Sequence, residues 1–441
     1  MKRMICNVAI LFLLLRIFEI QAASNGAAPT PPMGWSSWMV FKCYTWCSYY
    51  DSNPLCYSET NIKQVADAMI TGGYSDAGYK YIILDDCWQS ATRTWDDRLI
   101  ADPNRFPNQM RDLALYMHNR GLKFGIFSDL GKVSGQGFPG SYGRLEQDAN
   151  TFISWDVDYV KMSAASADPA LLNYLEYPEF GGYLMRSPRS IVYATSWPVY
   201  RTYNQYPIDY TSVQRSSNTW RFYGDMDASW QTLRKVMDNY TAQQETLIKV
   251  AGPGGWNDPD VLLVGSPGLS YDQCKVQMAI WCIIAAPLII SSDIRTLTNP
   301  YKAILQNRVA IGINQDVLGL PGYRIFTKNG VDVWIRKIKP DINGQYSYAL
   351  AFVNTYEDIS VSFSVTLDEL TLNSSSGYYM KDVFSSDTSA KGPIMIPASI
   401  LQMQISPTGV AFYKAELVTS SSTSTRSTDF QVIPEIIRYR Y

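Results

Sequence analysis

The sequence predicts an α/β protein: a (β/α)8 TIM barrel followed by a C-terminal antiparallel β-sandwich domain. Its 441 residues exceed one simple core and suit a domain of about 250–300 residues plus a smaller one. Up to about Asp293, strand-like runs alternate with helix-like runs, which is the pattern of a parallel barrel. Beyond Gly322 the chain changes to short alternating strands separated by turn signals, which indicates an antiparallel domain.

Eight apolar, β-branched runs are expected to form the barrel strands. They are Met33–Trp38, Tyr79–Asp85, Leu122–Ser128, Val157–Met162, Ser190–Ser196, Thr219–Tyr223, Ile248–Gly252 and Pro287–Ser291. Amphipathic helical patterns lie between them at Glu59–Thr71, Asn108–Asn119, Leu145–Trp155, Asp227–Tyr240 and Tyr271–Ala285. In such a barrel the carboxyl ends of the strands line the functional cleft.

The segment after Gly322 predicts the β domain, because Lys328-Asn-Gly and Asn343-Gly mark turns between short strands. The expected strands are Val331–Arg336, Tyr346–Asn354, Ile359–Val365, Tyr378–Val383 and Gly409–Lys414. We therefore expect a barrel over residues 24–320, a β domain over residues 321–418 and a Ser/Thr-rich tail over residues 419–441.

The N-terminus has the pattern of a secretory signal peptide over residues 1–23. Lys2 and Arg3 precede a short apolar run, and the small residues Ala22 and Ala23 follow it. No run approaches the about 20 apolar residues of a membrane span. Glycosylation acceptors at Asn239 and Asn373 agree with secretion. We expect a protein of the secretory pathway, either lysosomal or extracellular.

The net charge and the histidine content exclude several classes of ligand and of catalytic site. The formal net charge is −2, so no footprint for nucleic acid or for an anionic membrane surface is visible. His118 is the single histidine, and its helical context beside Asn119 and Arg120 indicates a surface or capping role. That excludes a Ser-His-Asp triad and a histidine zinc site. Acid–base chemistry must then use carboxylates, and we expect no metal and no cofactor.

Six cysteines remain once Cys6 is removed with the signal. Four of them lie early in the chain, where an oxidising compartment favours disulfides: Cys43, Cys47, Cys56 and Cys87. Cys274 and Cys282 lie in one helical run, where a rise of 1.5 Å per residue separates them by roughly 12 Å. That is too far for a disulfide, so we expect two buried thiols.

Polar residues at the predicted strand ends suit a hydroxyl-rich ligand, because carboxylates accept from sugar hydroxyls, cations donate and indoles stack. They are Trp38, Asp85, Asp86, Asp129, Lys161, Ser163, Ser196, Arg221, Asp225, Asp258 and Asp260. The alternative is that most of them cap the following helices, and for Asp129 and Asp258 both interpretations have equal weight. Asp85 and Asp86 favour function, because two carboxylates crowded at a buried strand end are costly unless a ligand or cation uses them.

Six motifs are recognisable: Thr30-Pro-Pro-Met-Gly-Trp-Ser-Ser-Trp38, Leu84-Asp-Asp-Cys-Trp88, Ala101-Asp-Pro-Asn-Arg-Phe-Pro107, Gly121-Leu-Lys-Phe-Gly-Ile126, Ala251-Gly-Pro-Gly-Gly-Trp-Asn-Asp-Pro-Asp260 and Ile313-Asn-Gln-Asp-Val-Leu-Gly319. Together they resemble glycoside hydrolase family 27, the family of lysosomal α-galactosidase and α-N-acetylgalactosaminidase. The resemblance runs from about Thr30 to Gly322 and more weakly through the β domain.

The resemblance implies a retaining mechanism with one nucleophilic and one acid/base aspartate. Trp220-Arg-Phe-Tyr-Gly-Asp225 matches the acid/base motif, so Asp225 inherits that role. The nucleophile motif corresponds to Lys161-Met-Ser-Ala-Ala165, which places Ser163 at the nucleophile position. A serine needs a base to act as a nucleophile, and its neutral side chain cannot stabilise an oxocarbenium-like transition state by charge.

The resemblance also implies disulfides Cys43–Cys87 and Cys47–Cys56. Two further pairs of the family are absent on both sides. Ala165 and Gly135 stand at one of these pairs, and Thr195 and Ser217 stand at the other. Losing cysteines as whole pairs indicates a lineage with a settled, altered site.

Other positions match sugar contacts of the family: Trp38, Asp85, Asp86, Lys161, Tyr200, Arg221 and Asp260. Phe127 replaces a sugar-contacting tyrosine and so lacks its hydroxyl. Ser196 resembles the N-acetylgalactosamine-selective type, whereas Val199 is bulkier than the alanine of that type. The family commonly dimerises, so we expect a homodimer.

Three functions follow from these residues. The first is a protein that binds terminal α-galactose or α-N-acetylgalactosamine without cleaving it. The second is an active α-glycosidase of glycolipids or glycoproteins that uses a relocated carboxylate, with Asp168 considered, or an assisting N-acetyl group. The third is a non-catalytic secreted subunit.

Overall fold

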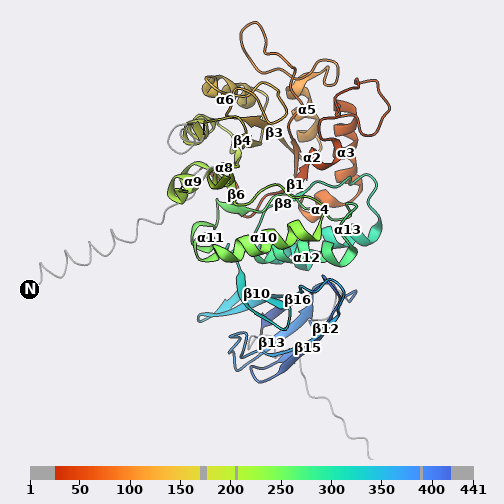
Figure 1. Ribbon diagram of the computed structural model, residues 1–441, viewed down its shortest axis with the longest axis vertical. Coiled ribbons are helices and arrows are strands. Elements are labelled where there is room, and N and C mark those ends of the chain that lie inside the picture. Colours follow the sequence, from red (N-terminus) through yellow and green to blue (C-terminus); the bar gives the residue numbers. More distant parts are fainter. Residues whose placement is uncertain (1–24, 169–175, 204–206, 388–390, 419–441) are drawn as a thin grey trace, which may run out of the picture.

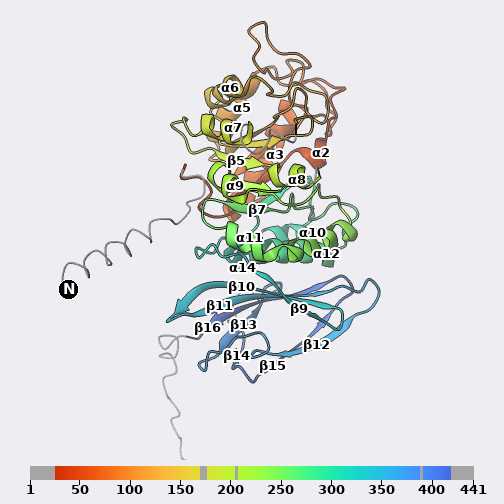
Figure 2. The same cartoon turned by 60° about the vertical axis from the view of Figure 1, so that its left-hand side comes forward.

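The computed structural model describes residues 25–168, 176–203, 207–387 and 391–418. The predicted signal peptide and the Ser/Thr-rich tail lie outside these residues. The chain forms an N-terminal barrel and a C-terminal β domain, with helices of the barrel lying between them (Figures 1 and 2).

The barrel is one parallel sheet of eight strands in the order β7-β6-β5-β4-β3-β2-β1-β8. The strands are β1 (Met33–Ser36), β2 (Tyr81–Leu84), β3 (Lys123–Asp129), β4 (Tyr159–Ser163), β5 (Val192–Thr195), β6 (Thr219–Arg221), β7 (Trp256–Asp258) and β8 (Leu288–Ile290). Leu262 closes the ring, because its N–H donates to Ile289 O (2.7 Å) and its carbonyl accepts from Ser291 N (2.9 Å). The predicted barrel is confirmed.

Helices follow the strands and cover the barrel. They are α2 (Trp38–Phe41), α3 (Glu59–Thr71), α4 (Tyr74–Ala77), α5 (Gln109–His118), α6 (Leu145–Ser154), α7 (Tyr177–Leu184), α8 (Trp197–Tyr203), α9 (Tyr210–Ser216), α10 (Trp230–Ala242), α11 (Gln244–Val250), α12 (Tyr271–Ile283), α13 (Asn299–Leu305) and α14 (Arg308–Asn314). Capping side chains fix the first residue of several helices. Ser270 and Gln273 form a capping box at the start of α12, and the Ser229 hydroxyl accepts from Thr232 N at the start of α10.

One strand prediction is wrong. Ile248–Gly252 overlaps the end of helix α11, and strand β7 lies further on at Trp256–Asp258. The apolar run is short enough to suit either state. The buried residue of α11 is Leu247, which precedes the run, so the run itself lies at the end of a helix that is buried on one side. The turn Gly252–Gly255 then reverses the chain into β7, with Gly252 N donating to Gly255 O (2.8 Å).

The β domain is a sandwich of two antiparallel sheets. The larger has the order β14-β13-β16-β11-β10-β9 and the smaller pairs β12 with β15. The strands are β9 (Tyr323–Lys328), β10 (Val331–Ile342), β11 (Gln345–Asn354), β12 (Val361–Thr366), β13 (Tyr378–Asp382), β14 (Ile394–Met395), β15 (Ile400–Ile405) and β16 (Val410–Leu417). Strands β9, β14 and β15 were not among those predicted from sequence.

Arg336 joins the two domains. It lies on β10, is fully buried, and donates to Cys282 O (2.5 Å) and to Leu320 O (2.9 Å). Burial lowers the pKa of Arg336 to about 10. Trp334 and Phe412 from the same sheet pack into the barrel's hydrophobic cluster. The interface therefore combines apolar packing with buried polar contacts, because Arg234 on α10 also pairs with the buried Asp332 on β10 (2.6 Å).

Two smaller expectations have clear outcomes. Cys274 and Cys282 are buried and unpaired, as predicted. His118 lies in the last turn of α5, where its Nε2 is 2.7 Å from Asp158 Oδ2. Within the described ranges, no helix has the length and hydrophobicity needed to cross a membrane.

Candidate functional site

A pocket of about 120 Å³ lies at the carboxyl ends of the barrel strands. It collects nearly all the residues singled out from the sequence: Trp38, Asp85, Asp86, Phe127, Lys161, Ser163, Ser196, Tyr200, Arg221, Asp225 and Asp260. Gly135, Gln136, Ala165 and Val261 complete the lining, and Gln136 and Val261 were missed because they lie in loops beyond the strand ends. Val199 is buried behind the pocket and is not among its lining residues.

Asp85, just after β2, and Lys161, on β4, form an ion pair in which Lys161 Nζ lies 2.6 Å from Asp85 Oδ2. Ser36 Oγ also donates to Asp85 Oδ2 (3.2 Å). Burial lowers the pKa of Lys161, but Asp85 and Asp260 outweigh burial and raise it. Lys161 is therefore a fixed cation on the pocket wall.

Arg221 links two further carboxylates. Its Nη1 is 3.2 Å from Asp260 Oδ1, and its Nη2 is 3.1 Å from Asp225 Oδ1. Asp260 has φ +83°, a conformation that non-glycine residues rarely adopt, and its Oδ2 accepts from Met226 N (2.9 Å). Arg221 Nε is buried and finds no hydrogen-bond partner within the described residues. The two terminal nitrogens of Arg221 are thus held by carboxylates on both sides, which fixes the guanidinium at the pocket wall.

Asp225 lies at the open side of the pocket, with 91% of its side chain exposed. Desolvation by the nearby walls raises its pKa, but Arg221 and Lys161 outweigh this and hold the pKa of Asp225 below its usual value. Asp225 is therefore ionised from mildly acidic pH upward.

Ser163 ends strand β4 and is buried. Its Oγ lies 2.8 Å from Tyr200 Oη. Burial raises the pKa of Asp129, and backbone hydrogen bonds and one from Ser163 offset only part of that rise. Burial raises the pKa of Tyr200, which keeps its hydroxyl protonated. The strand end that faces the ligand space is thus a pair of neutral hydroxyls.

Asp129 holds two loops together and does not face the pocket. It is fully buried, its Oδ1 accepts from Gly131 N (2.7 Å) and its Oδ2 accepts from Ala165 N (2.9 Å). It ties the loops after β3 and β4 together, so it is neither a helix cap nor part of the pocket lining. Asp258 Oδ1 accepts from Asp260 N (2.8 Å) and likewise shapes a loop.

Asp86 is buried beside Asp85 and accepts from Cys87 N (2.7 Å). Burial raises its pKa to about 6, against about 3.9 in an unfolded chain. Between these values the folded protein holds a proton that the unfolded chain has lost, so stability falls as the pH rises through this window.

We expect the free energy of unfolding to lose about 2–3 kcal/mol through Asp86 between about pH 4 and pH 7. Asp86→Asn should lack this component. Urea unfolding of both proteins at the two pH values measures the difference. An identical pH dependence in the two proteins would contradict the assignment.

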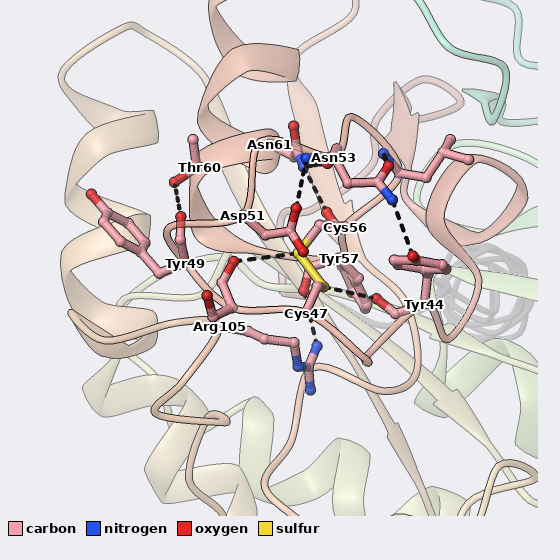
Figure 3. Close-up of a disulfide and its surroundings, with 12 residues drawn as sticks. Tyr44, Cys47, Tyr49, Asp51, Asn53, Cys56, Tyr57, Thr60, Asn61 and Arg105 are labelled. Carbon is pink, nitrogen blue, oxygen red and sulfur yellow. Dashed lines mark hydrogen bonds between the residues drawn. A yellow bond between two sulfur atoms is a disulfide. The ribbon is translucent and has the colours of Figure 1, made fainter.

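Two disulfides brace the loop beside the pocket. Cys43–Cys87 has a Cα–Cα distance of 5.5 Å, and Cys47–Cys56 has one of 5.9 Å. Figure 3 shows the second bridge, with Asn53 Nδ2 donating to Tyr44 Oη (3.0 Å) and Asn61 Nδ2 donating to Cys56 O (2.8 Å). Because Cys87 directly follows Asp86, the first bridge anchors this loop to the pocket wall.

The positions of the two implied but absent disulfides are close in space. A Cβ at Gly135 would lie 3.5 Å from Ala165 Cβ, within the range of disulfide-bonded cysteines. At the other pair, the Thr195 hydroxyl donates to Ser217 Oγ (3.1 Å). At Gly135 and Ala165 no side-chain bond takes the place of the bridge, whereas at Thr195 and Ser217 a buried hydrogen bond takes its place.

Comparison with known proteins gives the family. The model of the family described as "Alpha galactosidase A" matches residues 30–316. The chain belongs to this family, glycoside hydrolase family 27. Human α-galactosidase A is 39% identical over 380 residues, which cover 83% of this chain and 88% of the relative. Chicken α-N-acetylgalactosaminidase is 39% identical over 363 residues, covering 82% and 88%.

Solved structures of the family share the fold. The α-galactosidase of Saccharomyces cerevisiae has a TM-score of 0.77 and 25% identity, covering 90% of this chain and 99% of that one. It has also been solved with raffinose. α-Galactosidase I of Mortierella vinacea has a TM-score of 0.75 and 25% identity, covering 89% and 98%. Both matches cover about nine-tenths of this chain, so the structural likeness extends over the barrel and into the β domain.

Proposed function

We propose that this chain binds terminal α-galactose or α-N-acetylgalactosamine in the barrel pocket and does not cleave it by double displacement. The observation that carries the proposal is the neutral Ser163–Tyr200 pair at the end of β4, beside an otherwise charged pocket. Asp85, Lys161, Arg221 and Asp260 supply fixed charges for sugar hydroxyls.

The protonation of Asp225 supports the same proposal. A retaining glycosidase needs a protonated acid to assist the leaving group. Here the pKa of Asp225 is lowered by Arg221 and Lys161, and Ser163 contributes no negative charge that would raise it. Asp225 therefore serves as an acceptor for a sugar hydroxyl in this proposal.

An active glycosidase with a relocated carboxylate is the alternative. Asp129 is the buried carboxylate beside Ser163, but both of its oxygens already accept backbone N–H groups. Moving it would leave those donors unsatisfied, which costs about 1–3 kcal/mol for each. The alternative therefore requires another group, such as Asp168 or the N-acetyl group of the substrate itself.

The preference between the two sugars rests on Ser196 and Val199. Ser196 lines the pocket, and by the family resemblance a serine here leaves room for an acetamido group; Val199 is buried and is not among the lining residues. We propose that N-acetylgalactosamine is accepted along with galactose.

Binding without turnover is directly measurable. At a sugar concentration 100 times its Kd, the free energy of unfolding should rise by about 2.7 kcal/mol. Thermal unfolding with galactose and with N-acetylgalactosamine measures this, and glucose serves as the epimeric control. Absence of any shift with either sugar would contradict binding. Turnover of an aryl α-galactoside or α-N-acetylgalactosaminide by the wild type, abolished in Asp225→Ala, would favour the alternative.

The proposal includes a homodimer in the secretory pathway, lysosomal or extracellular. The disulfides support an oxidising compartment. Asn373 is exposed and Asn239 half-buried on α10, so the first is the better glycosylation acceptor. Trp46 and Tyr50 on the disulfide-braced loop are 92% and 90% exposed, as aromatic residues at an interface between copies would be.

A further inference from the structure

A second pocket of about 370 Å³ lies between helix α14 and the larger sheet of the β domain. Its volume is that of a small-molecule site. None of its residues belongs to the sugar pocket. The lining is Arg308, Val309, Gly312, Ile313, Asp316, Ile338, Lys339, Tyr379, Lys381, Lys391, Lys414 and Glu416. We call it the interdomain groove.

The packing of β16 explains why the groove exists. Alternate residues of a strand point to one face, so Phe412, Lys414 and Glu416 share the face toward the barrel. Phe412 packs into the barrel's hydrophobic cluster, whereas Lys414 and Glu416 line the groove. The sheet therefore rests on the barrel at one end of β16 and stands away from it at the other.

The groove concentrates positive charge on a protein whose net charge is −2. Its lining contains five cationic side chains and two carboxylates, Asp316 and Glu416. Lys414 Nζ is 2.7 Å from Glu416 Oε2, and Lys391 Nζ is 3.9 Å from Glu416 Oε1. One carboxylate thus serves two lysines.

The strand register adds a second observation. Lys381 on β13 lies directly opposite Lys414 on β16. Like charges at opposed positions repel each other, and an oxyanion bound between the two ammonium groups would add to the counter-charge that Glu416 supplies to Lys414. Tyr379 lies two residues before Lys381 on the same strand face and opposite Glu416, and Lys391 Nζ lies 5.0 Å from its ring centroid. The groove therefore combines opposed cations with an aromatic side chain.

We propose that the interdomain groove binds a saccharide that carries sulfate or phosphate esters. The tetrahedral oxyanion lies between Lys381 and Lys414 and accepts charge-assisted hydrogen bonds from their ammonium groups. The ring of Tyr379 offers an apolar surface to the attached sugar. A saccharide chain can enter a concave groove, whereas the flat surface of a membrane cannot. This inference goes beyond the sugar pocket and does not depend on it.

The test uses the full-length protein with a heparin-derived tetrasaccharide and with galactose 6-phosphate as probes. Both are titrated at low salt by calorimetry. Lys381→Glu/Lys414→Glu should weaken binding by about tenfold or more, as the loss of a charge-assisted contact does. Lys235→Glu/Lys249→Glu changes the net charge equally at exposed lysines of α10 and α11 and should leave binding within about twofold.

Binding of the tetrasaccharide, or binding of galactose 6-phosphate that Lys381→Glu/Lys414→Glu weakens, supports the groove and identifies the ester. Because the barrel pocket is proposed to hold galactose, galactose 6-phosphate binding that this variant leaves unchanged belongs to that pocket and counts against the groove. Failure of both probes to bind the wild type would overturn the proposal. Equal loss in the two double variants would also overturn it, because net charge alone would then explain binding. Lys381→Gln/Lys414→Gln is a milder change that guards against misfolding, and it should abolish the probe-induced rise in Tm while the galactose-induced rise persists.

Discussion

Ser163→Asp is expected to raise kcat/KM for an aryl α-galactoside by roughly 10³-fold or more over the wild type. The new carboxylate would stand at the end of β4, beside Tyr200 and the sugar pocket. It would supply both the nucleophile and the negative charge that an oxocarbenium-like transition state requires. Initial rates with the purified variant measure the gain.

The same substitution should change the titration of Asp225. In the wild type, Arg221 and Lys161 hold the pKa of Asp225 low. A second carboxylate nearby repels the ionised form and raises that pKa, so Asp225 becomes protonated at acidic pH and can act as the acid. We therefore expect a bell-shaped pH profile with an acidic optimum in Ser163→Asp.

Two controls separate charge from shape. Ser163→Asn has nearly the volume of aspartate without its charge and should stay inactive. Ser163→Asp/Asp225→Ala should lose the gained activity. If Ser163→Asp binds galactose as the wild type does and still shows no turnover, the missing nucleophile is not the reason for inactivity, and Phe127 becomes the next position to test.

Gly135→Cys/Ala165→Cys is expected to form a disulfide and raise the free energy of unfolding by about 2–4 kcal/mol. The two Cβ atoms would be 3.5 Å apart, and the backbone of Gly135 does not adopt a positive φ. The bridge would close a loop that spans the ends of β3 and β4, which Asp129 already ties together. Little native strain should therefore offset the lost freedom of the unfolded chain.

Denaturant unfolding measures this gain. Gly135→Ser/Ala165→Ser is the matched control, since it places similar side chains without a bridge. The cysteine and serine variants, both treated with the same mild reductant, should then unfold with the same free energy, because the reductant acts on the two native bridges equally in both. A cysteine variant that is oxidised but no more stable than the serine control would show that the present loop conformation differs from a bridged one.

Local patterns predicted the elements whose signals are strong. Helix α3 begins and ends at the predicted residues, Glu59 and Thr71, because an amphipathic repeat fills its whole length. The strand prediction for Ile248–Gly252 failed because a short apolar run has no clear period. Whether such a run forms a helix or a strand depends on its neighbours, here α10 and the turn before β7. Strands β9 and β14 were missed because they are largely exposed or very short and carry no clear period. Strand β15 was overlooked although Leu401, Met403 and Ile405 alternate with exposed residues, which is a local strand signal.

The aspartates likewise differ in how far their positions could be predicted from sequence. Asp85 and Asp86 could be assigned to a pocket because both end a buried strand. The place of Asp129 could not, because its partners Gly131 and Ala165 lie on two different loops. Likewise, the interdomain groove depends on the register that sets Lys381 against Lys414, and those residues are far apart along the chain.

The sequence by itself determined the barrel, the family resemblance and the serine at position 163, because these depend on residue identity and local periodicity. The tertiary structure alone decided what surrounds that serine. Its hydroxyl meets Tyr200, the neighbouring Asp129 is held by backbone donors, and Gly135 lies against Ala165. Those contacts join strands and loops whose spacing is set by closure of the barrel, and no local pattern encodes that closure.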